Sequence, residues 1–283
     1  MHSRRRAFTL VELLVVIGII TLLVAMLLPV FGGARRQADR VKCASNLRQL
    51  AAAFIMYGNE NRGWFPRSAS RFDHDRVEDW IHWHPPERNV SNSAIAPYLG
   101  RPTTPAIFRC PSDDWASHSL GLAAPNTGAA ERTYPYPFSY CMNIWLACDG
   151  WIYYREDPRY GEPYQAAKFS KVARPATTVL LLEVDERNLL HGAWSIPFTS
   201  SLQMGNTYMW GHLLSIRHDS RRPREQWRPY FVPGESNPDS RGNVAFVDGH
   251  VDFTARRVAH DPLSIMGFDP YKGEKTWATA PPR

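Results

Sequence analysis

Residues 13–31 read LLVVIGIITLLVAMLLPVF, an uninterrupted stretch of 19 residues without a charge. As an α-helix this stretch would be about 28 Å long, which is close to the hydrocarbon thickness of a bilayer. A helix buried in a protein core is rarely apolar on every face for five turns. The stretch therefore predicts a membrane-spanning helix, and Pro29 is expected to kink or loosen its last turn.

The flanks of this stretch leave its orientation open. Basic residues precede it at 4–6 and follow it at Arg35, Arg36, Arg40 and Lys42, so the positive charges do not distinguish its two ends. An ordinary secretory signal with cleavage near 32–34 fits the basic start, although the apolar core is long for one. A twin-arginine signal is the second interpretation, because residues 5–8 read RRAF.

The third interpretation rests on residues 6–14, RAFTLVELL. This segment resembles the type III signal of type IV prepilins and type II secretion pseudopilins. The resemblance implies that a prepilin peptidase cuts between Ala7 and Phe8 on the cytoplasmic side and then N-methylates Phe8. Residues 1–7 would be the leader peptide, with Ala7 at the position where the family usually has glycine. Glu12 corresponds to the acidic residue of the family motif.

Glu12 is a charged residue directly before the apolar stretch, where a charge has a free-energy cost if it enters the membrane. A carboxylate costs about 2.5–3.5 kcal/mol at the centre of a bilayer and less at its margin. The new amine of Phe8, in the same or a neighbouring subunit, is a candidate partner, which gives Glu12 a role in assembly. The alternative is that Glu12 reaches the membrane surface and has no partner.

Beyond the apolar stretch the sequence becomes amphipathic. Cys43, Leu47, Leu50, Phe54 and Tyr57 follow one another at steps of four, three, four and three, which places them on one helical face. We expect one helix to run through residues 8–58 and to lay this face against a globular head. The sequence at 58–59, Gly-Asn, predicts its C-terminal end.

The head, residues 59–283, is rich in proline, glycine and aromatic residues. Strand-like stretches lie at 138–146, 177–184 and 243–253. The last is divided by Asp248-Gly249, a typical two-residue hairpin signal. The expected fold is α+β and pilin-like, with a long N-terminal helix packed on an antiparallel sheet.

The region 218–253 resembles the processing-associated domain of prepilin-like proteins that is named for an H-x9-DG motif. His218, Asp248 and Gly249 match the motif, but 29 residues separate His218 from Asp248, so about twenty are inserted. Residues 108–113 (FRCPSD) and 139–143 (SYCMN) also resemble this family. We interpret the three matching residues as a structural motif in which His218 caps or bonds to the turn.

Two groups of residues could form a metal-binding or acid–base site. His218, Asp219, Asp248 and His250 could converge as a metal or acid–base site, but an Asp-Gly turn already explains two of them. His82 and His84, in DWIHWH, have metal-ligand spacing, but we favour a loop with two surface histidines. We therefore predict no catalytic residue, metal or cofactor. Several tryptophans lie near expected loops, and burial is favoured over sugar binding for each: Trp80, Trp83, Trp115, Trp145, Trp151 and Trp210.

The four cysteines fit an oxidising compartment outside the cytoplasmic membrane. Cys43 lies on the inward helical face, and Cys110 is the preferred candidate for a disulfide with it, with other pairings left open. Cys141 and Cys148 would be about 23 Å apart on a continuous strand, so a bond between them needs a turn.

Charge and composition limit the partners. The net charge is +6, and the three arginines at 4–6 supply half of it, so nucleic acid is not expected. The sequence predicts a non-enzymatic, pilin-like or pseudopilin-like subunit, anchored by one helix in the cytoplasmic membrane with its head outside. Its expected partners are the prepilin peptidase, other pilin-like subunits and the membrane. The alternative is an anchored or secreted enzyme, or a module that binds carbohydrate or metal.

Overall fold

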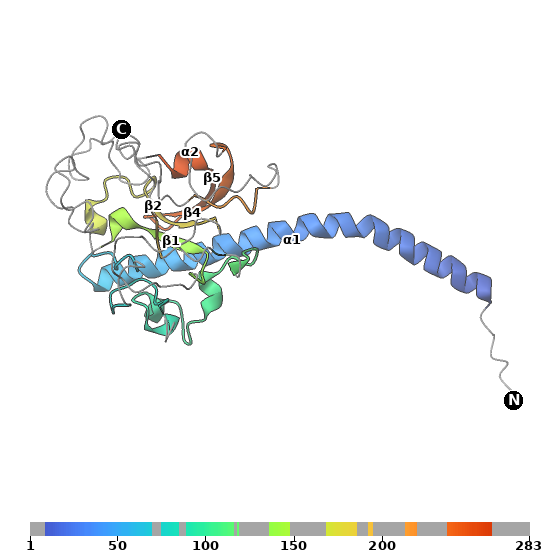
Figure 1. Ribbon diagram of the computed structural model, residues 1–283, viewed down its shortest axis with the longest axis horizontal. Coiled ribbons are helices and arrows are strands. Elements are labelled where there is room, and N and C mark those ends of the chain that lie inside the picture. Colours follow the sequence, from blue (N-terminus) through green and yellow to red (C-terminus); the bar gives the residue numbers. More distant parts are fainter. Residues whose placement is uncertain are drawn as a thin grey trace, which may run out of the picture.

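One long helix, α1 (Leu10–Glu60), organises the computed structural model. The structure describes residues 9–69, 75–84, 89–115, 118, 136–147, 168–185, 192–194, 213–219 and 237–261. In Figure 1 the head packs against the C-terminal half of α1, and the N-terminal half extends away from it along a gentle curve. The helix continues through Pro29 without a break.

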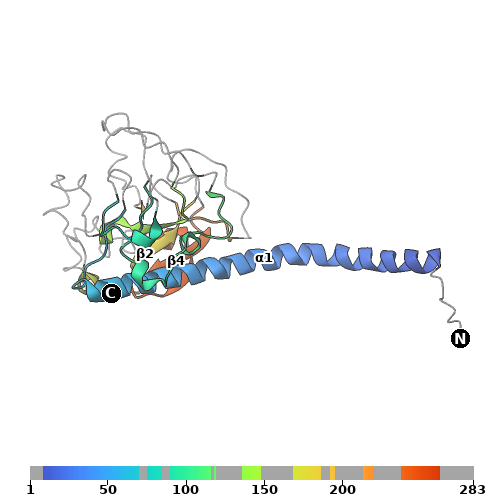
Figure 2. The same cartoon turned by 90° about the horizontal axis from the view of Figure 1, so that it is seen from below.

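The two halves of α1 differ in what their side chains contact. In the C-terminal half Cys43, Leu47, Leu50 and Phe54 are fully buried, which confirms the predicted inward face. In the N-terminal half large apolar side chains between Leu10 and Met26 are exposed. Figure 2 shows the sheet lying on one part of the helix only.

No helix in the described part of the chain is long and apolar enough to cross a membrane. The span predicted over residues 13–31 stays a prediction.

The C-terminal end of α1 lies slightly later than the sequence predicts. Gly58 is still helical and lies so close to the Phe169 ring that a Cβ atom there would approach a ring carbon to 2.4 Å. The helix ends before Asn61, its C-cap residue, whose backbone N–H donates to the Tyr57 carbonyl. Gly63 follows with a φ of 81°. A glycine is suited to this position because it adopts positive φ without a Cβ clash.

Five strands form one sheet in the order β3-β1-β2-β4-β5. They are β1 (Tyr140–Asn143), β2 (Val179–Glu183), β3 (Ala193–Trp194), β4 (Arg241–Phe246) and β5 (Val251–Ala255). The strand-like stretches of the sequence thus correspond to β1, β2 and the β4–β5 pair. The expected antiparallel pairing is confirmed for β1, β2, β4 and β5, whereas β3 pairs with β1 in parallel. The result is a mixed, mostly antiparallel sheet packed on a long helix.

The β4–β5 connection is longer than a two-residue turn. The strands end at Phe246 and resume at Val251, and the Gly249 N–H donates to the Phe246 carbonyl at 2.9 Å. Only Gly249 of the Asp-Gly pair has positive φ, at 92°, so the two-residue hairpin turn expected from the sequence was wrong. A Cβ at Gly249 would lie 3.0 Å from Ile55 of α1, which shows that the turn packs on the helix.

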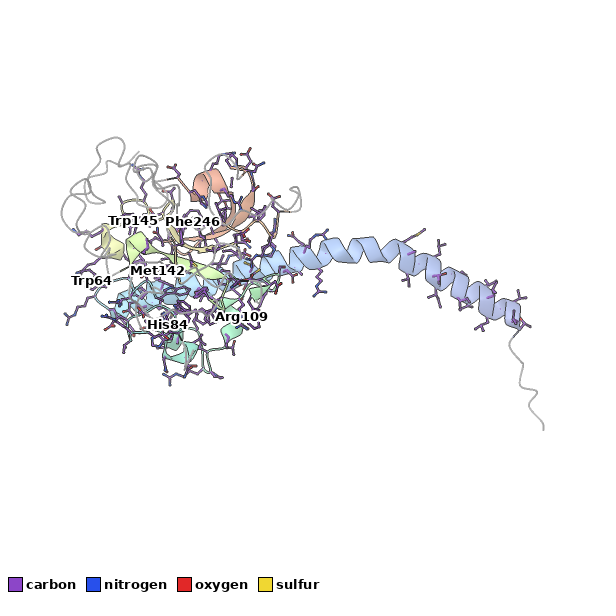
Figure 3. All side chains as sticks on the ribbon, in the orientation of Figure 1. Trp64, His84, Arg109, Met142, Trp145 and Phe246 are labelled. Atoms are coloured by element: carbon purple, nitrogen blue, oxygen red, sulfur yellow. The ribbon has the colours of Figure 1, made fainter. Side chains whose placement is uncertain are left out.

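Aromatic side chains fill the space between α1, the sheet and the loops. Trp80 is fully buried between Phe54 of α1 and Phe108, with ring centroids 5.7 Å and 6.1 Å away. Figure 3 shows the side chains crowding around the sheet, where Met142 and Trp145 lie. A short helix, α2 (Arg256–Ala259), follows β5 and packs on β4 and β5.

Candidate functional site

The N-terminus of α1 is fixed by two residues of the sequence motif. Thr9 caps the helix, because its Oγ1 accepts a hydrogen bond from the Glu12 N–H at 3.2 Å. In return Glu12 Oε2 accepts from the Thr9 N–H at 2.9 Å and from Thr9 Oγ1 at 2.8 Å. This reciprocal capping box satisfies two backbone donors and places the carboxylate beside the start of the helix. Ala7 and Phe8 lie outside the described residues.

The stalk half of α1 is held to the head by polar as well as apolar contacts. Asn46 donates its side-chain N–H to the Arg109 carbonyl at 3.0 Å, which ties the helix to the loop after η3 (Pro105–Phe108). Arg40 stacks over the Phe253 ring of β5 at 4.7 Å from the ring centroid. Cys43, one turn further along, points into the head.

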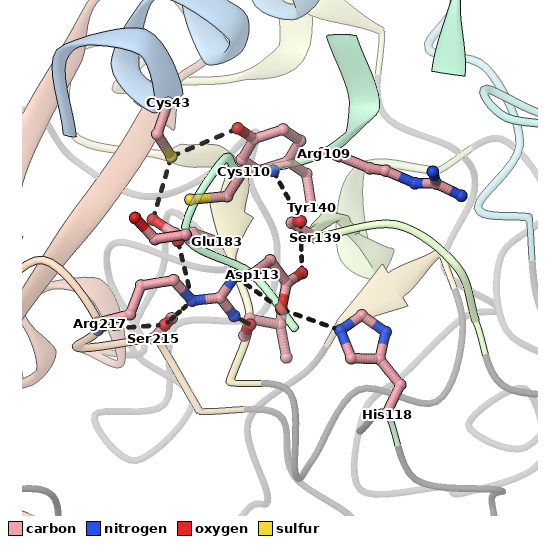
Figure 4. A network of polar contacts seen from close by, with 12 residues as sticks. Cys43, Arg109, Cys110, Asp113, His118, Ser139, Tyr140, Glu183, Ser215 and Arg217 are labelled. Carbon is pink, nitrogen blue, oxygen red and sulfur yellow. Dashed lines mark hydrogen bonds and ion pairs between the residues drawn. The ribbon is translucent and has the colours of Figure 1, made fainter. Parts of the chain in front are cut away.

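Four buried residues meet where α1 crosses the sheet, and we call them the Cys43 cluster: Cys43, Cys110, Glu183 and His218. They come from α1, the loop after η3, the end of β2 and the turn at 216–219. One ligand-type atom from each lies within 4.8 Å of the other three. Figure 4 shows this arrangement around Cys43 and Glu183.

Short contacts join the members of the Cys43 cluster. The Cys43 thiol donates to Glu183 Oε2 at 3.1 Å, and Cys110 Sγ lies 3.1 Å from His218 Nε2. His218 Nε2 lies 3.5 Å from Glu183 Oε1. The Tyr140 hydroxyl donates to Cys43 Sγ at 3.3 Å.

Arg217 connects the Cys43 cluster to a second acidic group. Its Nε lies 3.2 Å from Glu183 Oε1, and its NH1 lies 2.9 Å from Asp113 Oδ1. Asp113 also contacts His118 Nε2 at 3.0 Å and accepts from the Ser139 hydroxyl at 2.5 Å. The two motif segments at 108–113 and 139–143 therefore converge in space on one polar network.

The local charges set the protonation of this network. Burial raises the pKa of Glu183, but Arg217 and His218 outweigh it and bring that pKa to about 2. Burial lowers the pKa of His218, yet the Glu183 charge and the Cys110 contact raise it to about 10. Burial raises the pKa of the Cys43 thiol well above its usual value. An anionic carboxylate thus lies next to a cationic imidazole inside the head.

The structure brings Cys43 and Cys110 together, as the sequence analysis expected, but both are free thiols. The disulfide between them stays a prediction. Cys141 is buried as well, and Cys148 lies outside the described residues.

The histidine and aspartate residues of the sequence motif do not converge. His218 contacts Cys110 and Glu183 instead of the Asp248-Gly249 turn, so the expected cap on the turn was wrong. Asp248 Oδ1 lies 2.5 Å from Nδ1 of the exposed His250, and Asp219 accepts from the Arg241 N–H at 3.0 Å.

The prediction of two surface histidines in the 79–84 segment was wrong for His84. This residue is buried in the head (Figure 3), with Nδ1 2.5 Å from Asp75 Oδ1. His82 Nε2 instead lies 2.7 Å from the Arg76 carbonyl. The two histidines therefore have separate partners.

Burial is confirmed for most of the tryptophans that the structure describes. Trp80, Trp83 and Trp145 are buried, whereas Trp115 is 47% exposed. Trp151 and Trp210 lie outside the described residues.

The sequence does not predict Glu183 and Arg217 as members of a site. Glu183 closes a strand that otherwise reads VLLL, and all five residues of that strand are buried. A lone acidic residue at the end of a wholly apolar strand is a signal for a buried, partnered charge. Arg217 adjoins the motif histidine, but its two acidic partners are remote in sequence.

The helix on its sheet defines an α+β, pilin-like arrangement, and the comparisons with known proteins point to the same class. The family model described as the prokaryotic N-terminal methylation motif matches residues 2–28. The chain thus carries a prepilin-type methylation motif.

Two curated proteins are similar to this chain over its N-terminal region. The type II secretion system core protein G of Klebsiella pneumoniae is 41% identical over 59 residues, 21% of this chain and 42% of that protein. The protein of the same name from Pectobacterium carotovorum subsp. carotovorum is 40% identical over 58 residues, 20% of this chain and 37% of that protein. The chain spans less than half the length of either relative. No solved structure shows a significant match.

Proposed function

We propose that this chain is a membrane-anchored, non-enzymatic subunit of a type IV pilus or type II secretion-like assembly. A prepilin peptidase would cut it between Ala7 and Phe8. The proposal rests on one observation above all: the methylation motif opens a helix whose apolar half projects from the head with its side chains exposed. A large exposed apolar surface requires a bilayer or a partner to cover it.

Two environments could cover this surface in turn. Before assembly, lipid would surround the apolar residues from Leu10 to Met26, with the head outside the cytoplasm. In a filament, the same residues would pack against the helices of neighbouring subunits. Lipid is as apolar as these side chains, so van der Waals packing and polar pairs would drive the exchange.

The Glu12 carboxylate would supply one half of a polar pair in the assembly step. Its carboxylate accepts a hydrogen bond from the N–H of Thr9, the residue that follows Phe8. Cleavage before Phe8 would create a positive amine one residue away from this contact. The carboxylate could then pair with the amine of its own chain or of a neighbour, which is the role proposed from the sequence.

The mature N-terminus is the first test of this function. We expect the protein recovered from membranes to begin with N-methylated Phe8 and to retain the apolar residues 13–31. Intact-mass measurement with N-terminal sequencing distinguishes the three kinds of signal at once. A mature chain that starts near Arg35 would contradict the proposal and indicate a secretory or twin-arginine signal.

Glu12→Ala is expected to reduce the amount of subunit in sheared filaments about tenfold, with cleavage and membrane recovery unchanged. A tenfold loss matches one charge-assisted hydrogen bond of about 1.5 kcal/mol. The measurement is the subunit content of filaments sedimented after shearing.

Thr9→Ala is the matched control for Glu12→Ala. It removes the hydroxyl half of the capping box and keeps the carboxylate, so assembly should fall by less than about twofold if the charge is what matters. Equal losses in the two variants would show that Glu12 serves only as a helix cap. If the wild-type chain stays with membranes or medium and never sediments with filaments, it acts as a solitary anchored module.

A further inference from the structure

The Cys43 cluster combines donor atoms that have no common role in a simple hydrophobic core. They are two thiols, one carboxylate and one imidazole, all buried, and one ligand atom of each lies within 4.8 Å of the other three. Nothing in the pilin-like function uses them. We propose that the Cys43 cluster binds one divalent transition-metal ion, Zn²⁺ by its ligand chemistry, as a structural site that joins the helix to the head.

The donor set suits zinc. Thiolate, imidazole and carboxylate are its usual protein ligands, and four protein ligands without an open position are typical of structural sites. With a metal–sulfur bond of about 2.3 Å and a metal–nitrogen bond of about 2.0–2.1 Å, neighbouring ligands in a tetrahedron lie about 3.5 Å apart. Three contacts in the cluster are close to this separation: Cys43 Sγ to Glu183 Oε2 at 3.1 Å, Cys110 Sγ to His218 Nε2 at 3.1 Å and His218 Nε2 to Glu183 Oε1 at 3.5 Å.

The charge of the cluster also favours a cation. With both thiols ionised and His218 neutral, the four ligands carry a charge of −3, so a divalent ion leaves −1. Arg217, whose Nε lies 3.2 Å from Glu183 Oε1, is the neighbouring cation that offsets the remainder. Glu183 Oε1 is completely buried, and its contacts with Arg217 Nε at 3.2 Å and His218 Nε2 at 3.5 Å are ion pairs without good hydrogen-bond geometry. A bound cation would add a direct partner to this buried oxygen.

Surrounding groups hold the ligands in place. The Tyr140 hydroxyl donates to Cys43 Sγ at 3.3 Å, a contact that stabilises a thiolate. The Cys110 N–H donates to Ser139 Oγ at 2.8 Å, which fixes the loop that presents the second sulfur. Outer hydrogen bonds of this kind orient metal ligands and tune their basicity.

Such an ion would cross-link four segments that are far apart in sequence. Cys43 lies on α1, whereas Cys110, Glu183 and His218 belong to the head. The ion would therefore fasten the helix to the head at a point where a disulfide could otherwise do so. Metal binding and a Cys43–Cys110 disulfide are mutually exclusive, because both use the same two sulfur atoms.

The direct test measures metal in the full chain, purified in mild detergent without chelator. We expect one zinc ion per chain by elemental mass spectrometry. After removal of the metal under reducing conditions, added Co²⁺ should give near-ultraviolet sulfur-to-cobalt bands and the intense visible bands of tetrahedral cobalt. A reduced wild-type chain that binds neither Zn²⁺ nor Co²⁺ would overturn the proposal, and so would a Cys43–Cys110 disulfide found by peptide mapping after alkylation.

Variants assign the ligands. Cys43→Ser and Cys110→Ser should each reduce bound zinc to less than about a tenth and weaken the sulfur-to-cobalt bands. Cys141→Ser is the control, because Cys141 is equally buried but lies outside the cluster, and it should bind zinc as wild type does. Retention of stoichiometric zinc by Cys43→Ser and Cys110→Ser would refute the assignment. The cobalt spectrum of the unmodified chain decides the question even if a variant does not fold.

Discussion

Trp80→Ala is expected to lower the midpoint of thermal unfolding of the full chain by about 10 °C. Trp80 is completely buried between Phe54 of α1 and Phe108, and its Nε1 donates to the Gly192 carbonyl at 2.9 Å. Removing a buried tryptophan costs about 3–5 kcal/mol through lost transfer energy and the cavity that remains. In a domain of this size each kcal/mol shifts the midpoint by about 2–4 °C. The measurement is near-ultraviolet circular dichroism of the detergent-solubilised chain during heating.

Two further variants grade the contribution of the Trp80 side chain. Trp80→Phe keeps one aromatic ring but loses the Nε1 donor and the volume of the second ring, so the free energy of unfolding should fall by a smaller amount, about 1–3 kcal/mol. Trp115→Ala removes a half-exposed tryptophan and should change stability by less than about 0.5 kcal/mol. If Trp80→Ala and Trp115→Ala melt alike, the Trp80 side chain does not join α1 to the loops as described.

Gly242→Ala is expected to destabilise the head by about 3 kcal/mol or more. A Cβ atom at this position of β4 would lie 2.2 Å from the Ser215 carbonyl oxygen and 2.8 Å from Leu214 Cδ1. Overpacking a filled interior costs about 1–3 kcal/mol and more where the obstacle is backbone. The 213–219 segment also carries Arg217 and His218, so its displacement should disturb the Cys43 cluster as well. Thermal unfolding of the full chain gives the stability change.

Gly33→Ala provides the matched control for Gly242→Ala. A Cβ at Gly33 meets nothing within 4 Å, and alanine is favoured over glycine inside a helix by about 0.5–1 kcal/mol. This variant should therefore unfold at the wild-type temperature or slightly above. A Gly242→Ala chain that unfolds within about 2 °C of wild type would show that β4 and the 213–219 segment are not in close contact.

The Cys43 cluster contains residues that the sequence singled out and residues that it did not. The helical spacing of Cys43, Leu47, Leu50 and Phe54 indicated that Cys43 faces inward, and the motif segments drew attention to Cys110 and His218. From the sequence, Cys110 was assigned to a disulfide with Cys43, and His218 was assigned to a cap on the Asp248-Gly249 turn. A sequence shows only which residues are neighbours along the chain, so their neighbours in space were not considered. Glu183 was not predicted as a site residue because its partners lie in other segments of the chain.

Local periodicity in the sequence accounts for much of the fold. It predicted the inward face of α1 and the strands β1, β2, β4 and β5, because side-chain spacing decides which face of a helix or strand is apolar. The motif at 6–14 likewise indicated the class of protein from the order of its residues alone.

The meeting of distant residues, by contrast, is a property of the tertiary fold. Cys43 and His218 are 175 positions apart, and their encounter depends on how β2, β4 and the intervening loops close over the helix. The parallel pairing of β3 with β1 and the burial of His84 against Asp75 depend on the same closure. The free energy of a buried charge is set by the partners around it in space, and a linear pattern does not contain that information.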